Sequence, residues 1–168
     1  FSVSTPLTAL DQDRLTEYAN NGGKLFAMGQ DLAAVLGSDA VDDGSFFYNY
    51  VLGGAWLQDS VTAFLTPTLP ILPVTGAPSA FNGISVDLDD PAVNGGDGAG
   101  NQFYIDELET IPDEELADAY MALLQYPGES NVQDGVVAMA HRDQPSLESP
   151  DITYLGRSVY TSFGLEGV

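Results

Sequence analysis

An apolar stripe at helical spacing is the first pattern in the chain. Thr8 and Asp11 form a capping-box-like start, and the Asn-Asn-Gly-Gly run at 20–23 ends the pattern. We therefore predict a helix between these two signals. The stripe consists of Leu10, Leu15, Tyr18 and Ala19.

A short apolar run from Lys24 to Met28 follows. It is too short for a helix and is bounded by glycines, so it predicts a buried strand of a parallel sheet. Gln30 then occupies a glycine turn, and Asp31 is expected to cap a short helix over 32–36. Many α/β hydrolytic folds place a nucleophile on such a strand–turn–helix element. The amide of Gln30 cannot be deprotonated near neutral pH, so this turn lacks the nucleophile.

The next helical pattern is bounded by a serine and two glycines. Ser45 is expected to cap a helix through Val51, and the Gly-Gly pair at 53–54 ends it. A strand is expected over 55–58. The alternation of helices and strands up to this point is typical of βαβ units.

Aromatic side chains dominate this second helix. Spacings of three and four residues predict that Phe46, Phe47 and Tyr50 form a buried stripe, which leaves Tyr48 as the aromatic that faces outward. An alternative is that these rings and Trp56 are exposed and bind a carbohydrate by stacking on its apolar ring faces.

Prolines and short apolar runs characterise the chain from Thr62 onward, and they predict a β-rich section. We expect strands at 71–75, 81–88, 121–125, 135–140 and 158–163, and a helical turn over 112–119. The acidic run over 106–118 is expected to form a solvated helix face and loop.

Charge narrows the classes of partner. The 168 residues include 25 acidic and 4 basic residues, which give a formal net charge of −21. No basic residue lies between Lys24 and Arg142, so neither nucleic acid nor an anionic membrane is an expected partner. The hydrophobic content of 44% predicts a packed single domain over 1–168. The absence of cysteine excludes thiol catalysis and zinc–thiolate sites.

The chain begins at Phe1, and its first residues have the character of a strand that enters a turn. We interpret the chain as a fragment of a longer polypeptide. No apolar run is long enough to span a membrane. The acidic balance fits calcium binding, a high-salt habitat or solubility outside cells. The absence of cysteine is compatible with secretion.

A loop rich in Asp, Asn and Gly is the candidate metal site. Calcium prefers six to eight oxygen ligands, and the carboxylates and amides between 87 and 101 could supply them. The pattern is not that of an EF-hand, because Pro91 replaces a ligand, and a plain polar loop is the alternative interpretation. The candidate ligands are Asp87, Asp89, Asp90, Asp97 and Asn101, with Asn94 between them.

Three segments resemble class I glutamine amidotransferase-like domains of the kind appended to secreted bacterial subtilisin-like peptidases. They are LTALDQDRLTEYANNGGKLFAMGQDLAAVLG, FFYNYVLGGAWLQD and GRSVYTSFGLEGV. The resemblance implies a flavodoxin-like three-layer α/β sandwich whose first strands lie upstream of Phe1. The resemblance does not imply amidotransferase activity. Catalytic members use a cysteine at the position of Gln30, with a His-x-Glu motif late in the chain, and this chain has neither. Glu166 matches the late acidic position, so Gln30, Asp31 and Glu166 are the candidate residues of a vestigial ligand site.

A non-catalytic accessory domain is the function that these patterns favour. Its expected partners are neighbouring domains of the parent chain and a small ligand or carbohydrate. His141, the single histidine, is interpreted as a solvated strand-end residue, because the chain has no G-x-S-x-G motif to supply a nucleophile. A carboxylate-dependent hydrolase and a calcium-stabilised structural module are the alternatives.

Overall fold

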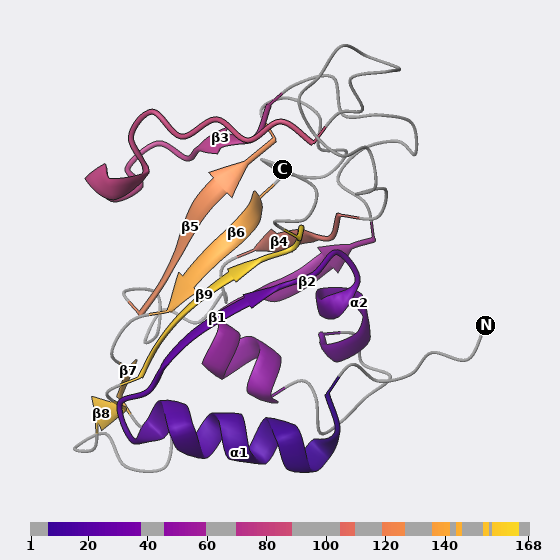
Figure 1. The fold of residues 1–168 in the computed structure, drawn as a ribbon, viewed down its shortest axis with the longest axis vertical. Helices are drawn as coiled ribbons and strands as arrows, with labels where there is room; N and C mark the ends of the chain where they lie inside the picture. Colours follow the sequence, from indigo (N-terminus) through magenta and orange to yellow (C-terminus); the bar gives the residue numbers. More distant parts are fainter. Residues whose placement is uncertain are drawn as a thin grey trace.

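The computed structural model describes residues 7–37, 46–59, 70–88, 105–109, 119–126, 136–141, 144–145, 153–154 and 156–164. This part of the chain forms a mixed α/β fold around a five-stranded sheet (Figure 1). The strand order is β1-β9-β6-β5-β3. The strands are β1 (Lys24–Met28), β3 (Leu72–Pro73), β5 (Tyr120–Gln125), β6 (Val136–His141) and β9 (Arg157–Thr161).

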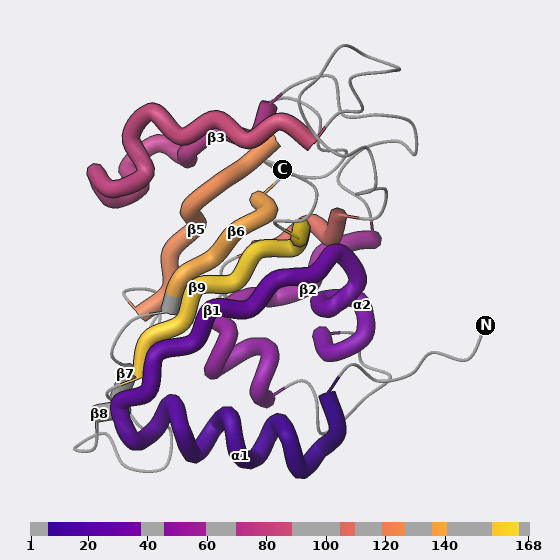
Figure 2. The backbone as a smooth tube through the Cα atoms, viewed as in Figure 1, coloured from indigo at the N-terminus to yellow at the C-terminus, as the bar shows by residue number. Residues whose placement is uncertain are grey.

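The sheet joins two distant parts of the sequence. β1 and β9 pair in parallel, with Phe26 opposite Val159, and they run side by side along the sheet (Figure 2). The pairs β9–β6, β6–β5 and β5–β3 are all antiparallel. The parallel partner expected for 24–28 is therefore confirmed, whereas the sheet as a whole is mixed.

Two short ladders lie beside this sheet. β2 (Ala55–Gln58) pairs with β4 (Glu107–Glu109), and β7 (Gln144–Pro145) pairs with β8 (Thr153–Tyr154), both antiparallel. The strand expected at 55–58 is confirmed. The βαβ interpretation of its pairing is wrong, because β2 joins β4 in a separate two-stranded sheet.

Helix α1 (Ala9–Asn20) begins and ends where the sequence predicts. The Asp11 backbone N–H donates to Thr8 Oγ1 over 3.2 Å, and the Thr8 N–H donates to Asp11 Oδ2 over 3.1 Å, which completes a capping box. The predicted stripe is only partly correct: Ala19 is buried, whereas Leu10 and Tyr18 are exposed.

The aromatic segment forms η1 (Phe47–Leu52), which is a π-helix. The Gly53 N–H donates to the carbonyl of Tyr48, five residues earlier, and Gly53 has a left-handed φ of 87°. Its buried side chains are those of Phe47, Tyr48, Val51 and Leu52, which lie on one side of the helix. Tyr48 is fully buried at 0% exposure and Phe46 is 46% exposed, so the expectation that Phe46 is buried and Tyr48 lies outside is wrong.

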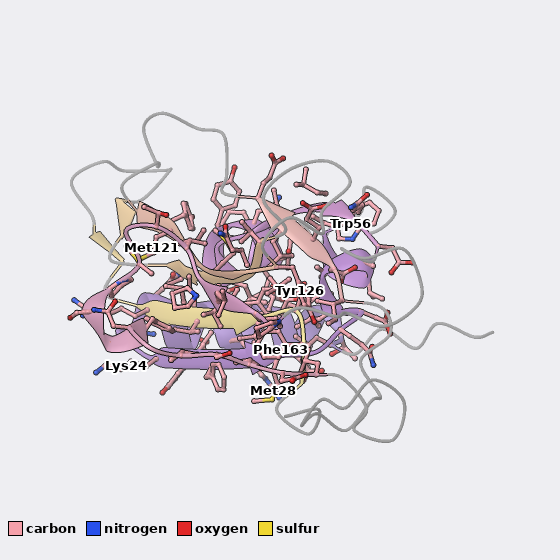
Figure 3. All side chains as sticks on the ribbon, turned by 90° about the horizontal axis from the view of Figure 1, so that it is seen from above. Lys24, Met28, Trp56, Met121, Tyr126 and Phe163 are labelled. Carbon is pink, nitrogen blue, oxygen red and sulfur yellow. The ribbon has the colours of Figure 1, made fainter. Side chains whose placement is uncertain are left out.

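Apolar side chains pack in two main clusters, on the two faces of the sheet. The consecutive residues Val159 and Tyr160 of β9 belong to different clusters, as expected from the alternation of side chains along a strand. Helix α1, helix α2 (Leu32–Leu36) and η1 all contribute to the cluster that contains Tyr160. The other cluster includes Tyr126 and Phe163, which Figure 3 labels.

Strand β1 is not the buried strand that the sequence predicts. Leu25 and Ala27 pack against the cluster that contains Tyr160. Phe26, however, is 54% exposed and Met28 is 38% exposed. In Figure 3, Lys24 and Met28 lie at the periphery. The reason is that β1 is the terminal strand of the described sheet, and one of its faces has no apolar layer over it.

The remaining strand predictions divide into correct and incorrect ones. β5, β6 and β9 confirm the strands expected near 121–125, 135–140 and 158–163. The run expected at 71–75 shortens to β3 plus a bridge between Ile71 and Val86. Residues 79–81 form the 3-10 helix η2 (Ser79–Phe81) rather than the start of a strand. The turn expected over 112–119 lies outside the described residues except at Ala119.

Candidate functional site

The turn between β1 and α2 is the strand–turn–helix element that the sequence predicts. It leaves β1 at Gly29, whose N–H donates to the carbonyl of Thr161 over 3.1 Å and so extends the pairing with β9. Gln30 is half-buried and Asp31 is exposed in the turn. In sheets with parallel strands, ligands bind outside the carboxyl ends of those strands, which is where this turn lies.

Asp31 occupies the N-cap position of α2, but its side chain makes no capping hydrogen bond. The expected capping role is therefore wrong, although the helix begins where it was predicted. Partial burial, and secondarily the nearby carboxylate of Asp59, raise the pKa of Asp31. Its carboxylate is thus available to the site rather than engaged with the helix.

A buried carboxyl group lies beneath this turn. Asp106 is 0% exposed; its Oδ2 accepts a hydrogen bond from the Ala34 N–H over 2.9 Å, and its Oδ1 accepts one from Trp56 Nε1 over 3.0 Å. Asp106 therefore connects α2 to β2. The expectation that the acidic run beginning at Asp106 is solvated is wrong for Asp106 and for Glu107, which is also fully buried.

Burial raises the pKa of Asp106 to about 7, because a buried ion loses its hydration. The hydrogen bonds from Ala34 and Trp56 act in the opposite direction, and the carboxylates of Asp59 and Asp31 add to the rise. Three acidic groups from three separate segments thus influence one another at this end of the sheet.

Two tyrosines complete the site. The rings of Tyr48 and Tyr160 meet edge to face, with their centroids 5.7 Å apart. The Tyr160 hydroxyl donates to the carbonyl of Gly29 over 3.4 Å. The Tyr48 hydroxyl has no hydrogen-bond partner within the described part of the chain. Burial, foremost, raises the pKa of both phenols. Tyr160 and then Asp106 add to the rise at Tyr48, and Asp106 adds to it at Tyr160, so both phenols stay neutral.

The arrangement offers a carboxyl group that can gain or lose a proton near neutral pH, with neutral hydroxyls close to it. Its neighbours Asp31 and Asp59 are exposed, and they place negative charge at the surface beside the turn. Such a set can accept hydrogen bonds from a polar ligand at the turn. It can also support acid–base chemistry if a substrate reaches Asp106.

Of the predicted vestigial site, the structure describes Gln30 and Asp31, which are adjacent in the turn. Glu166 lies outside the described residues. Asp106 and Trp56 are not among the residues that the sequence predicts for this site. The available signal was the pair Ile105 and Leu108, whose apolar side chains flank Asp106 and Glu107 and are buried with them.

The proposed calcium ligands fall almost entirely outside the described residues. Asp87 is described and half-buried, whereas Asp89, Asp90, Asp97 and Asn101 are not described. Within the described ranges, no group of three or more His, Cys, Asp or Glu side chains is arranged to hold a metal ion. The calcium site therefore remains a prediction.

Among the described helices, none has the length and apolar character needed to cross a membrane. His141 is the last residue of β6, at the strand end where it was predicted. The chain matches no protein-family model and no curated protein.

Proposed function

We propose that the chain is a non-catalytic accessory domain that binds a small polar ligand or a neighbouring domain at the β1–α2 turn. The observation that carries the proposal is Gln30, an amide at the position where this strand–turn–helix element would present a nucleophile. The element is retained and its nucleophile is absent. Binding is what such a turn can still do, through its backbone and through Asp31.

A flavodoxin-like fold is part of this proposal. The parallel pair β1–β9 and the turn at its carboxyl end support it, because that is where such folds bind ligands. The antiparallel pairs of β6 and β5 would be the departures from the pattern. Secretion and attachment to a subtilisin-like peptidase belong to the same proposal and rest on the resemblance alone.

A carboxylate-dependent hydrolase is the second candidate. The observation that favours it is Asp106, whose pKa of about 7 suits a general acid or base at neutral pH. The complete burial of its side chain opposes it, because a substrate would need the turn to open.

Hydrolysis assays separate the two candidates. The chain would be tested against p-nitrophenyl esters, p-nitrophenyl glycosides and a fluorogenic peptide, with Asp106→Asn, Asp31→Asn and the exposed control Asp13→Asn alongside. We expect no turnover above buffer for any of these proteins. Turnover that Asp106→Asn abolishes and Asp13→Asn leaves intact would contradict the accessory-domain proposal and establish the hydrolase.

Binding at the turn needs its own measurement. We expect an NMR titration with monosaccharides and short acidic or basic peptides to shift the backbone amides of Gln30 and Asp31. Gln30→Ala and Asp31→Ala should weaken that binding, and Asp13→Asn should not. A ligand that binds while leaving the turn amides unshifted would show that the site lies elsewhere.

A calcium-stabilised module makes a different prediction. EDTA would lower the melting temperature of the chain, and Asp87→Asn or Asp97→Asn would reduce that response. An EDTA effect that neither variant changes would place any calcium away from this loop.

A further inference from the structure

Within the described residues, strand β1 has one edge without a partner strand. The bond from the Gly29 N–H to the Thr161 carbonyl and the bond from the Arg157 N–H to the Gly23 carbonyl show which groups face β9. Because backbone groups alternate along a strand, the N–H and C=O groups of Phe26 point away from β9, as do those of Lys24 and Met28. Within the described part of the chain no strand pairs with this edge, since β1 ends the sheet.

An apolar cavity of about 400 Å³ lies along the same edge. Its walls include residues 25–28 of β1, whose side chains point alternately to the two faces of the sheet, so the cavity follows the strand itself. The opposite walls come from Leu7, Leu15, Leu32, Phe47 and Leu52. Apolar side chains from a second strand would therefore find an apolar surface beside β1.

The face of β1 that carries Phe26 is exposed. Phe26 is 54% exposed and Met28 is 38% exposed, and Lys24 lies on the same face because it is two residues before Phe26. Arg157 is the register partner of Lys24, and its side chain is also exposed. A long, apolar and unpaired edge attracts another strand unless something protects it.

We propose that β1 is a docking edge for an extended segment of a partner polypeptide, with apolar residues at alternate positions and an acidic residue beside Lys24. The segment would hydrogen-bond to the outward groups of Phe26 and Met28, as in strand addition to an exposed sheet edge. Its apolar side chains would enter the cavity on one face of the sheet, and the residues between them would lie beside Phe26 on the other face.

The basic residues beside this edge favour an acidic peptide over a second copy of the chain. Lys24 and Arg157 are two of the four basic residues in a chain with a net charge of −21, and they are neighbours in the sheet. An acidic partner residue is attracted there, whereas a second copy of the chain brings its own large negative charge. A fatty acyl chain could fill the cavity but would leave the backbone groups of the edge unpaired. The docking edge does not depend on the ligand site at the β1–α2 turn.

A peptide titration tests the proposal. The probe is a synthetic peptide of roughly nine residues, acetylated and amidated, with alternating Val and Thr and two Asp residues at one end. We expect saturable binding below about 1 mM, with shifted and exchange-protected amides at Phe26 and Met28. A version N-methylated at alternate residues, which cannot pair, should not bind.

Variants of the protein test whether the peptide binds at the edge of β1. Phe26→Pro removes an outward N–H while keeping the bonds to β9, and it should weaken binding about tenfold, whereas Phe26→Thr, which keeps the N–H, should weaken it less. Lys24→Glu should weaken binding by roughly threefold to tenfold in low salt. Arg14→Glu on α1 makes the same change of charge at an exposed site elsewhere and should have no effect.

Several outcomes would overturn the proposal. One is equal binding of the N-methylated and unmodified peptides, a comparison that holds even if Phe26→Pro fails to fold. Another is the absence of peptide binding at about 1 mM. Binding of laurate in the cavity without protection of the Phe26 amide would identify an acyl site, and a dimer through β1 in sedimentation would identify a second copy as the occupant.

Discussion

Asp106 is a carboxyl group that the fold removes entirely from water. Its oxygens accept two hydrogen bonds, but no Lys or Arg within the described residues is paired with it. Desolvation dominates over these bonds, and the pKa of Asp106 rises from 3.8 to about 7. Between these two pH values the folded protein binds more protons than the unfolded chain. Raising the pH through this window therefore lowers the free energy of unfolding.

Replacing Asp106 with asparagine should remove this part of the pH dependence. The shift to about 7 corresponds to roughly 4 kcal/mol between pH 4 and pH 8 in the wild-type protein. At low pH the free energy of unfolding of the variant should be about 1 kcal/mol lower than that of the wild type. The amide nitrogen cannot accept a hydrogen bond, so the variant loses one of the two bonds from Ala34 and Trp56. Urea unfolding across this range, with Asp13→Asn as control, measures the difference; parallel curves for wild type and Asp106→Asn would contradict it.

The Tyr48 hydroxyl is buried without a partner in the described part of the chain. Tyr48→Phe should therefore leave the free energy of unfolding unchanged or raise it by about 1 kcal/mol. Tyr160→Phe is the matched comparison, because it removes the hydrogen bond to Gly29 and should cost about 1 kcal/mol. Urea unfolding of both variants measures these changes in the free energy of unfolding. A larger loss for Tyr48→Phe would mean that a buried water serves its hydroxyl.

At the scale of elements, close backbone contacts set how α1 and β9 pack. A Cβ atom added at Gly156, just before β9, would clash with the carbonyl oxygen of Ala19 in the last turn of α1. That oxygen belongs to the backbone and cannot rotate away. The packing of α1 beside the start of β9 therefore requires glycine at 156.

Gly156→Ala should lower the free energy of unfolding by about 2 to 3 kcal/mol, because the helix must move away from the sheet. Gly76→Ala is the comparison: its φ of 88° is unfavourable for alanine, but an added Cβ meets no atom, so the cost should be about 1 kcal/mol. Thermal and urea unfolding measure both. Equal losses would show that the contact with Ala19 relaxes without cost.

At the scale of the whole molecule, the net charge of −21 opposes the folded state. Compact folding brings the acidic residues closer together than they are in the unfolded chain, and salt screens that repulsion. The same charge opposes association between copies of the chain.

Added sodium chloride should therefore raise the melting temperature, with most of the rise complete by about 0.5 M. Sodium chloride and potassium chloride at equal ionic strength should act alike. Differential scanning fluorimetry at a series of salt concentrations measures the melting temperature. A melting temperature that does not change with salt would show that the acidic groups are not under mutual repulsion in the folded protein.

Local signals in the sequence determined the helix α1, the strands β1, β5, β6 and β9, and the turn that carries Gln30. Each depends on residues close in the chain: the cap formed by Thr8 and Asp11, the glycines that end the helix, and apolar runs of strand length. Hydrogen bonds and steric limits over a few residues suffice to place such boundaries, so they can be read without the fold.

Only the tertiary structure decided which side chains are buried and which segments meet. Tyr48 is buried and Phe46 is exposed because the side of η1 that carries Tyr48 packs in the core. Asp106 is buried where Trp56 and Ala34 reach it from segments 50 and 72 residues away. The pairing of β1 with β9 likewise joins the two ends of the chain. Burial and pairing depend on contacts distant in sequence, and no local pattern contains them.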